Sequence, residues 1–99
     1  MRQNVLVIDD QTSNAMLVAE ILSGIAPEID VVTFVQPLEA VRYAAENPLD
    51  LVITDFSMPE LDGIGVIRQL KRMEHLFDVP IVVVTAHEGI DVRYAALDA

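Results

Sequence analysis

The sequence predicts an α/β fold, a doubly wound parallel sheet with helices on both faces. Four short apolar runs, at residues 5–8, 31–34, 51–54 and 81–85, are typical of buried parallel strands. Helical periodicity occupies the stretches between them, so strand and helix alternate along the chain. With 99 residues, 53% of them hydrophobic, the chain can bury a real core, and we expect one domain over residues 1–99.

The first predicted helix begins after Ser13, a residue type that caps helix starts, and ends near residues 24–27. Apolar residues recur along it at every fourth position, as in an amphipathic helix. They are Leu17, Ile21 and Ile25, with Val18 and Leu22 beside them.

Three further helices are predicted. Pro37 fits the first turn of the second helix, which ends before Pro48 because the residue ahead of a proline avoids helical geometry. Gly63 opens the third helix, whose apolar stripe is formed by Val66, Ile67, Leu70 and Met73. The fourth begins near Gly89 and continues to the end of the chain.

The charge balance narrows the classes of partner. Sixteen acidic and six basic residues give a formal net charge of -10, which argues against direct nucleic-acid binding. An acidic surface suits a basic protein partner, although solubility alone also explains scattered surface acids. The chain has no cysteine, no apparent secretory signal and no segment of membrane-spanning length, so we expect a cytoplasmic protein away from the membrane.

Three carboxylates stand where predicted strands stop. Asp9 and Asp10 follow the run at 5–8, and Asp55 follows the run at 51–54. Alone, each has a bland explanation as a loop or helix-cap residue. Together at the carboxyl edge of one sheet they repel one another, and Mg²⁺, which prefers oxygen ligands, relieves that repulsion. The sequence therefore predicts a Mg²⁺-dependent phosphoryl-accepting site.

Asp55 is the better candidate for a nucleophile, because it stands alone on the predicted central strand and a carboxylate can form an aspartyl-phosphate. The loop after Asp55 contains Pro59 and leads to Gly63. This loop can aim a backbone carbonyl at a metal, or its proline and glycine can simply form a turn. Thr85 ends the fourth strand, where its hydroxyl can donate to a phosphoryl oxygen or simply finish the strand.

Three motifs in order carry a family resemblance. They are Val-Leu-Val-Ile-Asp9-Asp10, then Leu-Val-Ile-Thr-Asp55-Phe-Ser-Met-Pro-Glu-Leu-Asp-Gly63, then Pro-Ile-Val-Val-Val-Thr85-Ala. This pattern closely resembles the receiver domain of two-component response regulators. The resemblance implies a flavodoxin-like, CheY-like fold with strand order 2-1-3-4-5, and a signalling domain rather than an enzyme. It also implies phosphorylation by a histidine kinase or a histidine phosphotransfer protein.

Matched residue by residue, the resemblance implies a role for each site residue. Asp55 would be the phosphoacceptor. Asp10 would coordinate Mg²⁺ directly, Asp9 through a water, and the backbone carbonyl of Ser57 would complete the protein ligands. Thr85 would be the switch hydroxyl that reports the phosphoryl group to the partner surface.

The chain departs from the family pattern after Thr85. The family carries a lysine at the end of a fifth strand, whereas the only lysine here, Lys71, belongs to the predicted third helix. We therefore expect a C-terminally incomplete domain with strand order 2-1-3-4 and no fifth βα unit, in which metal binding survives and phosphotransfer is weakened. The run at 81–84 would become an exposed edge, which favours self-association, exchange of elements, or a longer chain with an output domain.

Two other functions remain open on the sequence. A haloacid dehalogenase-type hydrolase also uses an aspartyl nucleophile with Mg²⁺, but places Asp-x-Asp after its first strand, where this chain has Asp9-Asp10-Gln11. A degenerate receiver that serves only as a protein-interaction module is favoured by the missing lysine and opposed by the intact acids and Thr85.

Overall fold

The computed structural model describes residues 2–58, 60–85 and 91–95 of the chain. The strands are β1 (Gln3–Ile8), β2 (Ile29–Phe34), β3 (Leu51–Asp55), β4 (Ile81–Thr85) and β5 (Asp91–Ala95). The helices are α1 (Thr12–Ile25), α2 (Pro37–Glu46) and α3 (Gly63–Lys71), with a short 3₁₀ turn at Glu74–Leu76. Within the described residues no helix is long and apolar enough to cross a membrane.

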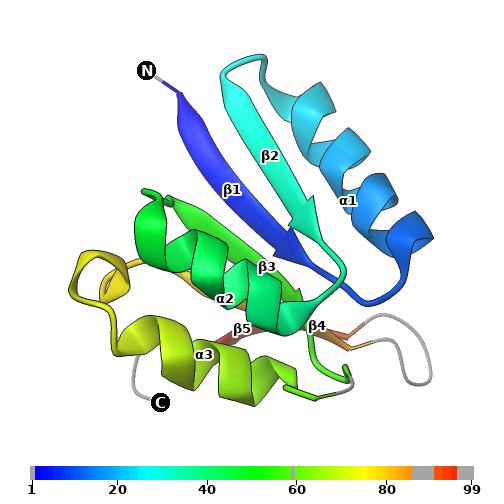
Figure 1. Cartoon of the computed structure of the whole chain (residues 1–99). Coiled ribbons are helices and arrows are strands. Elements are labelled where there is room, and N and C mark those ends of the chain that lie inside the picture. Colours follow the sequence, from blue (N-terminus) through cyan, green and yellow to red (C-terminus); the bar gives the residue numbers. More distant parts are fainter. Residues whose placement is uncertain (1, 59, 86–90, 96–99) are drawn as a thin grey trace.

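The strands form one sheet in the order β2-β1-β3-β4-β5, and the first four are parallel (Figure 1). This confirms the α/β class and the predicted order 2-1-3-4. The register pairs Ile8 with both Phe34 and Thr54, and Asp55 with Val84, so the carboxyl ends of these strands lie level at one edge. Residues that follow β1 and β3 therefore meet at that edge.

Alternate residues of β1 divide the interior into two layers. Leu6 and Ile8 pack with α2 and α3 in the larger cluster, whereas Val5 and Val7 pack with Ala15 of α1 in the smaller one. Figure 1 shows the same division, with α1 on one side of the sheet and α2 and α3 on the other. The period of two in a strand places successive side chains on opposite faces, which is why one central strand serves both layers.

The predicted helix from Gly89 to the chain end is wrong over residues 91–95. These residues form β5, which runs antiparallel to β4 and pairs Val83 with Arg93. Val92 and Tyr94 are strand-forming residue types at alternate positions, and the edge of β4 offers unpaired backbone groups. The expectation of an exposed β4 edge is wrong for the same reason. The rest of the predicted helix, residues 89–90 and 96–99, lies outside the described residues.

The predicted stripe of α1 divides between two faces. Val18 and Leu22 pack toward the sheet beside buried Ala15, but Leu17, Ile21 and Ile25 are 56%, 57% and 68% exposed. Apolar residues occur around much of α1, so a period of four selects more than one stripe, and contact with β1 and β2 decides which is inner. The helix also begins at Thr12, ahead of the predicted cap Ser13.

Neighbouring substitutions in α1 test this division. Leu22→Ala is expected to lower the free energy of unfolding by about 1–2 kcal/mol, because Leu22 is half-buried against the sheet. Ile21→Ala is expected to cost less than about 0.5 kcal/mol, since its side chain is already exposed. Urea denaturation of the two variants measures both values, and equal losses would contradict the observed orientation of α1.

Candidate functional site

The three predicted acids lie together at the carboxyl edge of the sheet. One carboxylate oxygen from each of Asp9, Asp10 and Asp55 lies within 4.8 Å of the others. Asp9 and Asp55 are half-buried and Asp10 is exposed, so the group opens toward solvent on one side. The adjacency of β1 and β3 causes this meeting, because Ile8 and Thr54 are in register and each precedes an acid.

Burial and mutual repulsion raise the pKa of two of these acids. For Asp55 the largest cause is burial, followed by the charge of Asp9 and, more weakly, that of Asp10. Hydrogen bonds from the backbone of Phe56 and Ser57 oppose the rise. The pKa of Asp9 is likewise raised, first by burial and then by Asp10, while the backbone N–H of Gln11 donates to its carboxylate at 2.9 Å and opposes the rise. A bound cation would offset both causes.

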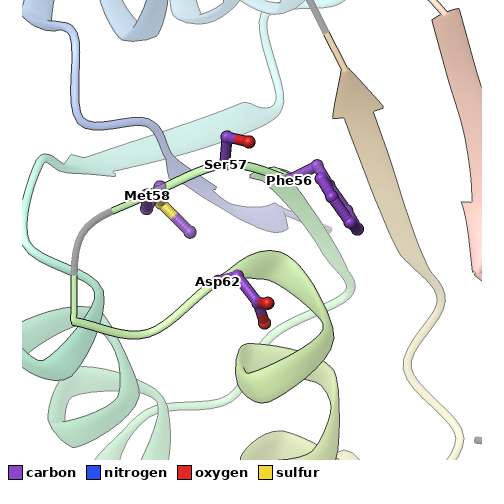
Figure 2. A pocket seen from close by; sticks show the side chains of 4 residues that line it. All are labelled: Phe56, Ser57, Met58 and Asp62. Atoms are coloured by element: carbon purple, nitrogen blue, oxygen red, sulfur yellow. The ribbon is translucent and has the colours of Figure 1, made fainter.

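The loop between β3 and α3 is anchored by its backbone at both ends. The N–H of Phe56 donates to the carbonyl of Val84 at 3.0 Å, and the carbonyl of Phe56 accepts from Gly63 N–H at 2.9 Å. Asp62 caps α3 by accepting from Gly65 N–H at 2.8 Å. Four residues of this segment, Phe56, Ser57, Met58 and Asp62, line an open pocket of about 340 Å³ (Figure 2). Pro59, which the sequence analysis placed in this loop, lies outside the described residues.

The other predicted residues are placed only in part. Thr85 is the last residue of β4, one position beyond Val84, so its backbone reaches the edge where the acids lie. The prediction about its hydroxyl lies outside what the structure describes. Lys71 binds away from the acids: its Nζ donates to the carbonyl oxygens of Phe77 and Val79 at 3.1 and 2.6 Å. Burial lowers the pKa of this lysine.

Sequence analysis missed one residue of the site. Thr54 is fully buried, and its hydroxyl donates to the backbone carbonyl of Asp55 at 3.1 Å. In the sequence it is the last residue of an apolar run. A hydroxyl in an otherwise apolar strand, directly before the candidate nucleophile, was the available signal, since buried polar groups need a partner.

The fold is therefore α/β, with three acids gathered at the carboxyl edge of its parallel strands, the edge at which open α/β sheets bind ligands. The model of the response regulator receiver domain matches residues 5–99, so this chain belongs to that family. The family is a signalling domain in two-component systems rather than a conventional enzyme, and a dehalogenase-type hydrolase is no longer a candidate.

Full-length relatives carry such a domain in different settings. The chain is 34% identical over 96 residues to the cyclic di-GMP phosphodiesterase response regulator RpfG of Xanthomonas campestris, covering 97% of this chain and 25% of that protein. It is 38% identical over 96 residues to the transcriptional regulatory protein PrrA of Mycobacterium tuberculosis, covering 96% and 39%. The chain thus spans about a quarter to two-fifths of the length of these relatives.

Solved structures agree with the fold. CheY4 of Vibrio cholerae, a chemotaxis response regulator, aligns with a TM-score of 0.81 at 24% identity, covering 90% of this chain and 72% of that one. The receiver domain of the sensor histidine kinase PA1611 of Pseudomonas aeruginosa aligns with a TM-score of 0.79 at 26% identity, covering 88% and 70%. That structure has a magnesium ion coordinated in its active-site cleft.

Proposed function

We propose that this chain accepts a phosphoryl group on Asp55 from a phosphohistidine of a histidine kinase or histidine phosphotransfer protein, with Mg²⁺, in the cytoplasm. The single observation that carries the proposal is the meeting of three carboxylates within 4.8 Å at the carboxyl edge of the sheet. Membership of the receiver family and the magnesium ion in the P. aeruginosa receiver support it.

The donor set fits a hard divalent cation. Carboxylates of Asp10 and Asp55 and the backbone carbonyl of Ser57 would hold Mg²⁺, and Asp9 would act through a water; all of these donors are oxygen, as Mg²⁺ requires. When bound, the ion neutralises charge on the phosphoryl oxygens. Asp10 is the exposed member, so the cation enters from the solvent side.

The chain's own part in the transfer is nucleophilic attack. An ionised carboxylate oxygen of Asp55 forms a bond to phosphorus, the phosphorus–nitrogen bond of the donor histidine breaks, and the released imidazole takes up a proton. Half-burial of Asp55 removes competing water from part of the carboxylate. The hydroxyl of Thr85, at the end of β4, would donate to a phosphoryl oxygen after transfer.

The acidic surface and the lengths of the relatives bear on the partners. A chain with a formal net charge of -10 suits a phosphodonor with a basic docking surface. An output domain in a longer polypeptide is part of this proposal, because the match covers only 25% of RpfG and 39% of PrrA. The earlier reason for self-association no longer applies, since β5 pairs with the β4 edge.

Incubation with acetyl phosphate or phosphoramidate and Mg²⁺ tests the function. Intact-mass spectrometry is expected to show one phosphoryl group, lost in Asp55→Asn, in which the amide is a far weaker nucleophile. Asp78→Asn makes the same charge change at an exposed loop before β4 and is expected to be phosphorylated like the wild type. A modified Asp55→Asn protein would contradict the assignment.

The alternative is a degenerate receiver that binds partners without efficient phosphotransfer. One observation bears on it: Lys71 donates to the carbonyls of Phe77 and Val79, so this lysine does not supply a positive charge beside the acids. Beryllofluoride with Mg²⁺ separates the two functions. Chemical-shift changes around Asp55 and Thr85 support phosphoacceptance, whereas an unchanged spectrum supports the alternative.

A further inference from the structure

The start of α3 lies directly against the backbone of the candidate phosphoacceptor. A Cβ atom built on Gly63 would lie 2.8 Å from the carbonyl oxygen of Asp55, 3.1 Å from the Cα of Phe56 and 3.5 Å from the carbonyl carbon of Asp55. Carbon atoms of side chains do not approach a backbone oxygen that closely without displacement. Only glycine therefore fits at this position without moving the Asp55–Phe56 peptide.

The same peptide is held from other directions. The hydroxyl of buried Thr54 donates to the Asp55 carbonyl at 3.1 Å. The N–H of Phe56, in the same peptide, donates to the carbonyl of Val84 in β4 at 3.0 Å. The carbonyl of Phe56, in the next peptide, accepts from Gly63 N–H of α3 at 2.9 Å. The peptide between nucleophile and loop is thus fixed by three elements, β3, β4 and α3.

We propose that Gly63 and Thr54 are positioning residues of the phosphoryl-accepting site: together they fix the Asp55–Phe56 peptide, and with it the nucleophile and the loop that carries Ser57. The inference rests on the proposed function, because it assigns to these residues the geometry that Mg²⁺ binding and phosphoryl transfer need. Neither residue contacts the reacting group itself; both act through Asp55.

Neither side of the contact can yield easily. On the helix side, Val66, Ile67 and Leu70 of α3 are almost completely buried, and Asp62 caps its first turn. On the loop side, Met58 is 9% exposed and packs in the same cluster, and Glu60 has a φ of 72°, a left-handed conformation that a non-glycine residue keeps only when its surroundings enforce it. A methyl group at position 63 would therefore shift the Asp55–Phe56 peptide.

The shift has a predictable size and result. Restoring ordinary contact at the Asp55 carbonyl requires a displacement of roughly half an ångström. Mg²⁺ demands near-ideal octahedral geometry, so a ligand carbonyl at Ser57 moved that far weakens the site. Misplacement of reacting groups by about 1 Å costs about 100-fold in rate, so about tenfold is expected here.

Two other glycines in the described residues give matched controls. At Gly65, two residues further along α3, an added Cβ would lie 3.0 Å from Cγ of Leu61 and closer still to its Cδ1. Leu61 belongs to the same loop, so Gly65→Ala tests pressure on the loop without contact with the Asp55 backbone. At Gly24 in α1 nothing lies within 4 Å of an added Cβ. Substitution by alanine adds one methyl group in each case, and of these three sites only Gly63 would contact the Asp55 backbone.

The experiment compares Gly63→Ala with Gly65→Ala and Gly24→Ala in the full chain, at a temperature where circular dichroism shows each to be folded. Isothermal titration measures the dissociation constant for Mg²⁺, and acetyl phosphate at saturating Mg²⁺ measures the phosphorylation rate. Gly63→Ala is expected to weaken Mg²⁺ binding and slow phosphorylation about tenfold each. Gly24→Ala is expected to match the wild type, and Gly65→Ala, which contacts the Leu61 side chain rather than the Asp55 backbone, is expected to lose less than Gly63→Ala. A merely structural role would lower only the melting temperature.

A second variant, Thr54→Val, removes a different contact with the Asp55–Phe56 peptide. It tests the inference alone if Gly63→Ala does not fold. It keeps the side-chain shape but removes the hydroxyl that holds the Asp55 carbonyl, so the same two losses are expected in a smaller degree. Folded variants with unchanged affinity and rate would overturn the inference alone. A wild type that neither binds Mg²⁺ nor accepts phosphoryl would overturn the proposed function, and the inference with it.

Discussion

Magnesium is expected to raise the melting temperature of this protein at pH 7 and to lose that effect as the pH falls toward 4. The metal-free protein holds three acids within 4.8 Å of one another, and burial and repulsion raise the pKa of Asp9 and Asp55. At 100 times its dissociation constant a ligand adds about 2.7 kcal/mol to the free energy of unfolding. For a domain of this size that shifts the melting temperature by on the order of 10 °C.

The sign of the pH dependence follows from the raised pKa values. A carboxyl whose pKa is higher in the folded than in the unfolded state contributes stability that is fully present below its unfolded pKa, about 3.9. That stability is lost as the pH rises through the folded pKa. The repulsion between Asp9 and Asp55 therefore acts above their raised pKa values, and as the pH falls through those values protonation removes both the repulsion and the ionised metal ligands.

Substitutions separate the effect of carboxylate repulsion on the melting temperature from the effect of Mg²⁺ binding. Asp55→Asn is expected to raise the melting temperature of the metal-free protein at pH 7, since one repelling charge is gone, and to reduce the increment from MgCl₂. Asp78→Asn, in an exposed loop before β4, removes a charge that faces Lys71 rather than the acids, so it should not raise the melting temperature and should leave the increment from MgCl₂ unchanged. Thermal denaturation followed by circular dichroism from pH 4 to 8, with and without MgCl₂, measures all of these. An equal increment at pH 4 and pH 7 would contradict the carboxylate site.

The parallel part of the fold was predictable because its signals are local. Each of the first four strands is a short apolar run bounded by turn residues, and alternation with helices restricts the topology to very few arrangements. β5 was not predictable in this way. Val92 and Tyr94 in five residues are compatible with helix or strand, and the free edge of β4, a tertiary feature, decides between them.

The candidate site, too, was predictable only where its signals are local. The acids were predictable because Asp9, Asp10 and Asp55 stand where apolar strand runs end, and the carboxyl ends of neighbouring parallel strands must meet. The contact of Gly63 with the Asp55 carbonyl was not predictable, because the sequence around Gly63 also fits an ordinary helix start. A distance of 2.8 Å between a virtual Cβ and a carbonyl depends on how α3 packs, which sequence spacing does not contain.

Ile67→Ala is expected to remove a large part of the stability of the domain. Ile67 is 1% exposed and lies on α3 in the larger cluster, with Leu6 and Ile8 of β1 among its members. Truncation of a buried isoleucine to alanine costs about 2–5 kcal/mol, because the cavity adds to the lost burial. Domains of this length have a total of about 5–15 kcal/mol, so mid-range values lower the midpoint of urea denaturation by about a third.

The neighbouring Ile64 supplies the control, because it lies one turn earlier on the same helix and is 37% exposed. Ile64→Ala is expected to cost less than half as much, and a loss as large as that of Ile67→Ala would contradict the orientation of α3.

The stability lost in Ile67→Ala also bears on the acidic site, because α3 carries Gly63 against the Asp55 peptide. On the proposed function Mg²⁺ binds the folded state, so MgCl₂ at 100 times the dissociation constant should restore about 2.7 kcal/mol to Ile67→Ala. A variant that is folded yet gains nothing from Mg²⁺ would show that α3 had moved away from the loop.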